Sequence, residues 1–236
     1  MKILLTGGSG LLGRNLIPHL RKHEVFAPSS IELDITDPLS FIESSNPFFS
    51  MPSKCDLIIH CAAIAKFADA EKDPFGTIDT NIQGTCNALK HAMSQNARFV
   101  FISSSHVFDG QKGNYAHTDL PNPLTRYAKS KVAGEMATLI YEKSLVIRTE
   151  FCDVDFPFDT AFTDKYSSKE YIDIIAPKIA KKCLSKQTGI CHVGSSRRSF
   201  YEFGQLRNPN VKPGSVENLL KTSIVPILID TSLIEN

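Results

Sequence analysis

A glycine-rich turn near the start of the chain constrains its fold more than any other feature. The apolar run Lys2 to Thr6 leads directly into Gly7-Gly8-Ser9-Gly10-Leu11-Leu12-Gly13-Arg14, where an amphipathic segment begins. Gly7 permits a tight turn, Gly10 lets a pyrophosphate approach the backbone, and Gly13 lets a helix pack closely on the preceding strand. Glycines can also serve loop geometry alone. Between a strand and a helix, however, this spacing predicts a dinucleotide-binding turn formed by residues 7–14.

Short apolar runs alternate with longer amphipathic segments through the first two thirds of the chain. This is the pattern of βαβ units around a parallel sheet. The expected strands cover residues 2–6, 24–27, 56–61, 98–103, 145–148 and 189–193. The expected helices cover residues 11–22, 38–44, 74–95, 125–142 and 171–184. Pro18 should bend or shorten the first helix, because proline removes a backbone donor. The fold class is therefore α/β, with a Rossmann-type doubly wound parallel sheet.

The length of the chain bounds its domain organisation. At 236 residues it can bury one full core but not two full-sized domains. Residues 1–149 are expected to form the dinucleotide-binding domain. Residues 150–169 are rich in Asp, Phe, Thr and Pro without a clear period, which predicts an irregular segment outside the sheet. Residues 150–236 are thus expected to form a small substrate-binding lobe, together with a returning strand and helix of the sheet.

Composition excludes several functional classes. The net charge is +1, from 26 basic and 25 acidic residues, so no broad basic field for nucleic acid or anionic lipid is expected. No apolar stretch approaches the ~20 residues of a membrane span, and the opening residues already form a core strand rather than a leader, which predicts a cytoplasmic protein. The six cysteines show neither paired nor zinc-finger spacing, so no metal site is expected.

A tyrosine and a lysine stand one helical turn apart in Tyr127-Ala-Lys-Ser-Lys131. A phenol with a pKa near ~10 exchanges protons poorly at neutral pH unless a nearby cation stabilises its phenolate, which Lys131 could do. The plainer interpretation is a half-buried aromatic ring beside a surface charge. The run Phe101 to Gly110 favours the chemical interpretation, because it follows a buried strand and would bring hydroxyl groups to the rim of the sheet.

The end of the second expected strand bears on the choice of cofactor. A carboxylate there would bind the free ribose hydroxyls of NAD, whereas this chain offers Ser29 and Ser30, which can donate to a 2′-phosphate. Arg14 could add a positive charge, or it could be a solvated surface residue. NADP is therefore the expected cofactor. Glu32 is a rival acidic residue that keeps NAD open.

With the glycine turn, the run Phe101 to Gly110 and the Tyr127/Lys131 pair, the sequence resembles the extended short-chain dehydrogenase/reductase family. Within that family it is most similar to the dTDP-4-dehydrorhamnose reductase branch. Further similar segments are residues 33–37, 123–131, 146–149, 189–194, 201–203 and 230–233.

The resemblance implies roles for individual residues. Ser104 would orient the substrate carbonyl, Tyr127 would be the general acid, and Lys131 would bind the cofactor ribose. Further cofactor contacts would come from Asp34 and Ile35 beside the adenine and from the backbone of Cys61-Ala62-Ala63. Asn81 matches a structural asparagine of the family.

Two departures from the family pattern concern the substrate. Ser105 and His106 stand where this branch commonly has Asp and Tyr, so the expected substrate contacts of Ser104, Ser105 and His106 differ from the usual ones. The lobe between Thr149 and Tyr171 is also shortened.

The resemblance implies an NADPH-dependent reductase of a nucleotide-linked 4-keto-6-deoxysugar carried on dTDP or UDP, with a homodimer as one expected assembly. Two alternatives stay open. One is an NAD-retaining nucleotide-sugar epimerase or dehydratase. The other is a non-catalytic regulatory subunit of the methionine adenosyltransferase type, in which the fold serves as a binding module.

Overall fold

The computed structural model describes residues 1–42, 52–223 and 225–236. The central sheet of this part of the chain has the strand order β10-β5-β4-β3-β1-β2, and every neighbouring pair is parallel. Its strands are β1 (Lys2–Thr6), β2 (Glu24–Phe26), β3 (Leu57–His60), β4 (Arg98–Ile102), β5 (Ser144–Thr149) and β10 (Gly189–Val193). The central strands are buried on both faces, which explains their nearly continuous apolar sequences.

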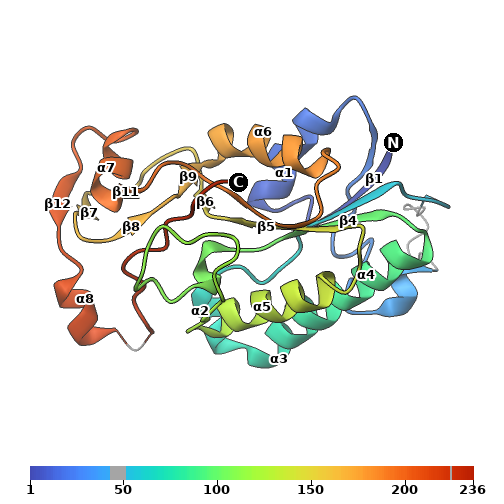
Figure 1. Ribbon diagram of the computed structural model, residues 1–236, viewed down its shortest axis with the longest axis horizontal. Helices are drawn as coiled ribbons and strands as arrows, with labels where there is room; N and C mark the ends of the chain where they lie inside the picture. The colour runs from blue at the N-terminus through green and yellow to red at the C-terminus, as the bar shows by residue number, and fades with distance from the viewer. Residues whose placement is uncertain (43–51, 224) are drawn as a thin grey trace.

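Helices cover both faces of this sheet (Figure 1). One face carries α1 (Leu11–Leu20) and α6 (Ile172–Cys183). The other face carries α2 (Phe67–Lys72), α3 (Pro74–Thr77), the π-helical turn η2 (Ile78–Gln83), α4 (Gly84–Ser94) and α5 (Arg126–Thr138). A separate apolar cluster fills each interface between helices and sheet. The predicted doubly wound α/β fold is confirmed.

The helix predictions differ from the structure in several places, and one of them is that α5 ends at Thr138 rather than at residue 142. The first helix ends at Leu20, two residues beyond Pro18, rather than at residue 22. The predicted helix over residues 74–95 is interrupted by η2, and α2 before it was missed because it is only six residues long. Of the predicted helix 38–44, residues 38–41 form the short 3-10 helix η1 (Pro38–Phe41), and the end lies outside the described residues.

The small lobe is built from pairs of very short strands, on the left in Figure 1. The pairs are β6 (Phe151–Cys152) with β9 (Glu170–Tyr171), β7 (Thr160–Phe162) with β12 (Lys212–Gly214), and β8 (Tyr166–Ser167) with β11 (Arg198–Ser199). Two helices, α7 (Phe200–Gln205) and α8 (Glu217–Thr222), complete it. The expectation that residues 150–169 are irregular is thus wrong in part. Strands of two or three residues are too short to show a period, and most of their partners lie far along the chain.

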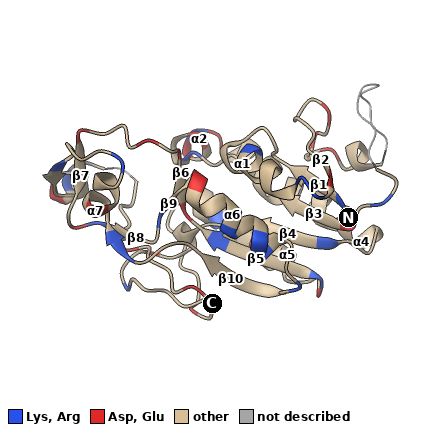
Figure 2. Cartoon of the chain, turned by 90° about the horizontal axis from the view of Figure 1, so that it is seen from above, with Lys and Arg blue, Asp and Glu red and all other residues tan. Residues whose placement is uncertain are grey.

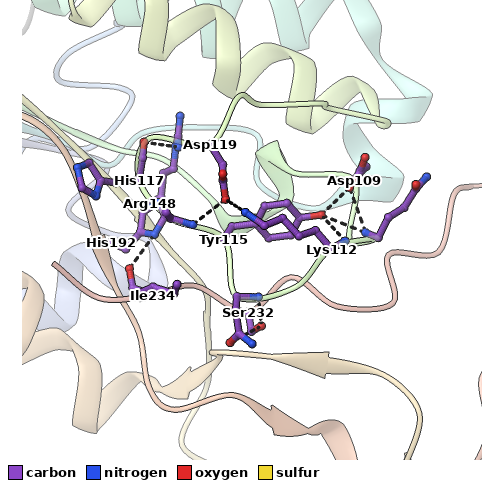
Figure 3. Close-up of polar contacts among 12 residues, drawn as sticks. Asp109, Lys112, Tyr115, His117, Asp119, Arg148, His192, Ser232 and Ile234 are labelled. Carbon is purple, nitrogen blue, oxygen red and sulfur yellow. Dashed lines mark hydrogen bonds and ion pairs between the residues drawn. The ribbon is translucent and has the colours of Figure 1, made fainter.

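The last residues of the chain connect the lobe to a loop of the sheet domain (Figure 3). Ser232 Oγ accepts a hydrogen bond from the Asn114 amide at 2.7 Å, and its carbonyl accepts one from the Tyr115 amide at 2.8 Å. The Tyr115 hydroxyl in turn donates to Asp109 at 2.5 Å. These contacts fix the loop after β4 from both sides.

Charged side chains of both signs are distributed over the sheet domain and the lobe (Figure 2). None of the helices in the described ranges is long and apolar enough to cross a membrane. The six cysteines are free thiols. Within the described residues, no group of three or more His, Cys, Asp and Glu side chains is placed to hold a metal ion.

A buried histidine links two of the layers. On β3, His60 lies 2.7 Å from Thr6 Oγ1 through Nδ1 and 3.1 Å from Thr85 Oγ1 through Nε2. Its ring stacks on Phe99 and Phe101, at centroid distances of 5.9 and 6.0 Å. Complete burial lowers its pKa from 6.5 to about 3, so it is neutral in the folded protein.

This histidine should make stability depend on pH. Between pH 6.5 and about 3 the unfolded chain binds the proton and the folded chain does not, so the His60 contribution is complete above pH 6.5 and is lost as pH falls. We expect His60→Gln to flatten the pH dependence of the free energy of unfolding between pH 5 and 7, by up to ~1.4 kcal/mol per pH unit. Urea titrations at the two pH values measure this. Equal slopes for the two proteins would contradict it.

Candidate active site

Two adjoining cavities, of about 320 Å³ and about 310 Å³, lie at the carboxyl ends of the sheet strands. Gly7, Gly10, Cys61 and Ala63 line both of them. The strands behind these residues, β1 and β3, are neighbours, but the chain continues from them to helices on opposite faces. This is the switch point at which doubly wound sheets bind their ligands.

The glycine turn is shaped to hold a phosphate group. Gly7 has a φ of +72°, and a Cβ there would lie 2.6 Å from the Ala62 amide nitrogen. A Cβ on Gly13 would overlap the Gly7 carbonyl oxygen, so α1 can approach the turn only with glycine at that position. A Cβ on Gly10 would meet only the Gly7 oxygen, at 3.2 Å, and would otherwise occupy the cleft. The predicted cradle for a dinucleotide pyrophosphate is therefore present in the geometry of the turn.

The smaller cavity has the lining expected for the adenosine half of a dinucleotide. Asp34, Ile35, Ala62 and Ser9 line it together with Ser30, as the sequence predicted for most of them. Asp34 Oδ1 accepts hydrogen bonds from the amide and the hydroxyl of Thr36, at 2.9 and 2.7 Å.

Ser29 and Arg14, two of the predicted cofactor contacts, do not line this cavity. The amide and hydroxyl of Ser29 both donate to Glu32 at 2.8 Å, and these bonds lower the pKa of that carboxyl. Arg14 is exposed and lies 3.5 Å from Asp153. Neither Ser29 nor Arg14 lines the cavity, whereas Ser30 does. Donors for a 2′-phosphate would thus come first from Ser30.

The larger cavity brings together the predicted catalytic residues. Tyr127 and Lys131 project from α5, and Ser104 follows β4. Burial raises the pKa of Tyr127 to about 12, while a hydrogen bond with Ser104 acts in the opposite direction. The expectation that Lys131 lowers the phenol pKa differs from this result, because desolvation, together with the charge of Glu150, outweighs the hydrogen bond with Ser104. Tyr127 therefore keeps its proton at neutral pH and can donate it.

Lys131 is 4% exposed, and its ammonium lies 4.1 Å from the centroid of the Phe101 ring. Burial lowers its pKa to about 8, opposed by Cys61 and Glu135. At neutral pH it is a desolvated cation on the wall of the cavity, which is suited to binding hydroxyl groups of a ligand.

His106 lies beside the serine rather than in place of the acid. Residues 105–107 form the short 3-10 helix η3 (Ser105–Val107). His106 Nδ1 lies 3.2 Å from Ser104 Oγ, and burial lowers its pKa to about 4. His106 thus makes a structural contact with the serine through its ring. His106 also lines the cavity, so a contact between His106 and the substrate remains a proposal.

A buried ion pair lies beneath these residues. Arg148 Nη2 on β5 donates to Glu135 Oε2 on α5 at 2.7 Å, with side chains that are 1% and 0% exposed. The guanidinium carbon also lies 5.0 Å from the centroid of the Phe108 ring. Arg148 Nη1 donates to the carbonyl of His117 (Figure 3). α5 and β5 therefore keep a fixed position relative to each other.

Comparison with known proteins agrees with this geometry. The family model described as RmlD substrate binding domain matches residues 1–176. The chain belongs to this family. A dTDP-4-dehydrorhamnose reductase from Aggregatibacter actinomycetemcomitans is 34% identical over 158 residues, which cover 64% of this chain and 51% of the relative. The beta subunit of methionine adenosyltransferase 2 from Bos taurus is 30% identical over 147 residues, covering 58% and 42%. The chain thus spans about half the length of the curated relatives it matches.

Solved structures match over the whole chain. A dTDP-4-dehydrorhamnose reductase from Bacillus anthracis, in complex with NADP, superposes with a TM-score of 0.85 at 23% identity, covering 100% of this chain and 90% of that one. An orthologue from Clostridium acetobutylicum gives the same TM-score and coverage at 26% identity. These matches establish the Rossmann-type fold of this RmlD-family chain.

One predicted substrate contact of this family member is misplaced. The Ser105 side chain is fully buried and its hydroxyl donates to Glu150 Oε2 at 2.7 Å, so it does not line the cavity. The turn of η3 directs Ser105 inward and His106 toward the ligand side. A direct substrate contact by Ser105 is therefore wrong, and the serine instead supports the glutamate.

Several residues of the cavity wall escaped the sequence analysis. Phe67 packs edge-on against both His106 and Tyr127, at centroid distances of 4.8 and 5.2 Å. Glu150 and Lys169 also line the cavity. Glu150 lies two residues beyond the predicted strand 145–148, at the carboxyl edge of the sheet, and that position could have indicated it. The local sequence around Phe67 and Lys169 gives no indication that these residues line the cavity.

Asn81 shows how the π-helical turn serves the site. Its Oδ1 accepts from the Ile64 amide at 2.7 Å, and its Nδ2 donates to the Ile64 carbonyl at 3.1 Å and to Ser130 Oγ at 2.9 Å. The asparagine thereby joins the loop after β3 to α5, in agreement with the structural role that the resemblance implies.

The glycine turn can be tested against a matched glycine. Gly189 also has a positive φ, +81°, but a Cβ there would meet nothing within 4 Å. We expect Gly7→Ala to lower the free energy of unfolding by ~2–4 kcal/mol and Gly189→Ala by ~1–2 kcal/mol, because only Gly7 adds a steric overlap to the backbone strain. Denaturant titration measures both. Equal losses would contradict the close approach of Gly7 to Ala62.

Proposed function

We propose that this protein is an NADPH-dependent reductase of a nucleotide-linked 4-keto-6-deoxysugar, with dTDP or UDP as the carrier. The observation that carries the proposal is the convergence of Ser104, Tyr127 and Lys131 in a cavity that adjoins the glycine cradle. The family and the reductase relatives support it.

The residues divide the work between binding and proton transfer. When bound, NADPH supplies the hydride. The Ser104 hydroxyl donates to the substrate carbonyl oxygen and so fixes its position. Tyr127 Oη, which is protonated at neutral pH, gives its proton to that same oxygen, on which hydride addition places a negative charge. Lys131 binds the ribose of the cofactor through its ammonium group.

NADPH is proposed in preference to NADH. Ser30 lines the adenosine cavity in the loop after β2. Asp34 is the acidic residue in the lining of this cavity, and its Oδ1 already accepts hydrogen bonds from Thr36. The similar structure from Bacillus anthracis carries NADP. We expect tighter binding of NADPH than of NADH in fluorescence titrations. Because the hydroxyl of Ser29 is engaged by Glu32, Ser30→Ala should reduce the preference more than Ser29→Ala; equal affinities for the two cofactors would contradict the assignment.

A regulatory binding module is the second candidate. The similarity to the methionine adenosyltransferase subunit favours it, as do the departures at Ser105 and His106. The intact set of Ser104, Tyr127 and Lys131 favours the reductase. A panel of dTDP- and UDP-linked 4-keto sugars with NADPH, followed at the nicotinamide absorbance, separates the two. Oxidation of NADPH with one of these sugars would establish the reductase. Absence of NADPH oxidation with every sugar of the panel would favour the binding module.

An NAD-retaining epimerase or dehydratase would purify with bound cofactor, which an absorbance spectrum of the protein detects.

The homodimer and the cytoplasmic location remain predictions. Light scattering of the purified protein tests the first.

Tyr127→Phe isolates the proton donor. The variant keeps the ring and its packing against Phe67 but removes the phenolic oxygen. We expect kcat to fall by ~10²–10⁴-fold with NADPH affinity almost unchanged. Lys131→Met should weaken NADPH binding as well, because it removes the ribose-binding cation. A Tyr127→Phe loss below ~10-fold on a verified keto-sugar would contradict the assigned role.

A further inference from the structure

A second ion pair lies in the wall of the larger cavity, apart from the proposed catalytic residues. Lys169 Nζ lies 3.3 Å from Glu150 Oε1, and the two side chains are 20% and 6% exposed. Both residues line the cavity that contains Ser104 and Tyr127. The proposed reaction gives this pair no role.

Hydrogen bonds from two hydroxyl groups fix the position of the Glu150 carboxylate. Glu150 Oε2 accepts from Ser105 Oγ at 2.7 Å and from Thr231 Oγ1 at 3.1 Å. Glu150 Oε1 is buried and has no hydrogen bond within the described residues, and its ion-pair partner is Lys169. The charge of Lys165, which does not line the cavity, also helps to lower the pKa of Glu150. The carboxylate is therefore fixed in place, and its free oxygen depends on Lys169.

The lysine faces the cavity. Its ammonium lies 4.7 Å from the centroid of the Phe200 ring, and Glu150 is the only ion-pair partner that the described residues give it. An ammonium has three donors, so Lys169 can interact with Glu150 and still donate to a ligand.

The charges of this cavity can be counted from its lining. The charged side chains are Lys131, Glu150 and Lys169, and His106 is neutral because burial lowers its pKa to about 4. Under the proposed function Lys131 binds the cofactor ribose. Among the charged lining residues this leaves Glu150 and Lys169, which together have no net charge.

We infer that the Glu150–Lys169 pair makes this cavity select neutral sugars over sugars that carry a carboxylate. A hydroxyl accepts from Lys169 without disturbing the pair. A carboxylate would lie close to the fixed charge of Glu150, and it could pair with Lys169 only by competing with Glu150 for the one cation among the described residues in ion-pair contact with it. The inference rests on the proposed function and specifies its substrate class.

Binding measurements test this without requiring turnover. The probes are UDP-glucose, UDP-glucuronic acid and the corresponding dTDP sugars, titrated by calorimetry into the NADPH-loaded protein. We expect the wild-type protein to bind the glucose member of a pair at least ~10-fold more tightly than the glucuronate member.

Two variants should change this ratio in opposite directions. Glu150→Gln preserves size and can still accept from Ser105 and Thr231, but it leaves Lys169 uncompensated, so the preference for glucose should fall by ~10-fold or reverse. Lys169→Met leaves the carboxylate unpaired and should increase the preference. This partly exposed position also provides a test if Glu150→Gln does not fold.

Glu170→Gln is the matched control. Glu170 is also a buried carboxylate of the lobe, paired with Arg198 at 2.9 Å, but it does not line the cavity. It should keep the wild-type ratio. An unchanged ratio in both Glu150→Gln and Lys169→Met would overturn the inference while leaving the proposed function intact. Failure of all the probes to bind the wild-type protein would instead overturn the nucleotide-sugar assignment and the inference with it.

Discussion

The buried carboxylate of Glu135 holds together the three elements that carry the active site. It accepts from Ser103 Oγ at the end of β4, at 2.5 Å, and from Arg148 Nε and Nη2 on β5, at 3.0 and 2.7 Å. Ser103 precedes the serine of the site, and Glu135 lies one helical turn beyond Lys131 on α5. Removing one partner of such a pair leaves a buried charge without compensation, which costs about 3–5 kcal/mol. The positions of the serine, the tyrosine and the lysine all depend on this contact.

Burial shifts the pKa of each ionisable group of the cavity in the direction that favours its neutral form. It raises the pKa of Tyr127 to about 12 and lowers that of Lys131 to about 8. Glu150 is as deeply buried, yet Lys169 and its other neighbours more than offset the desolvation and lower its pKa to about 2. The cavity therefore combines a protonated phenol, Tyr127, with an ionised carboxylate, Glu150.

The sequence predicted best where one local pattern determines the structure. The glycine turn, the buried strands and the i, i+4 spacing of Tyr127 and Lys131 are all local, and the doubly wound sheet follows from their alternation. The paired strands of the lobe depend on partners up to 52 residues away, such as Thr160 and Lys212, and they leave no periodicity. The inward turn of Ser105 depends on Glu150, 45 residues later. Contacts of this kind are decided by the tertiary fold and could not be predicted from the sequence.

Transfer of an isotope from cofactor to substrate tests the central claim most directly. The protein would be incubated with a dTDP-linked 4-keto-6-deoxysugar and NADPH deuterated at the transferred position, and the product sugar analysed by mass spectrometry and NMR. The account predicts deuterium at C4 of the sugar in amounts equimolar with the NADPH consumed. Tight NADPH binding without any consumption, or consumption that leaves no deuterium in the sugar, would contradict it.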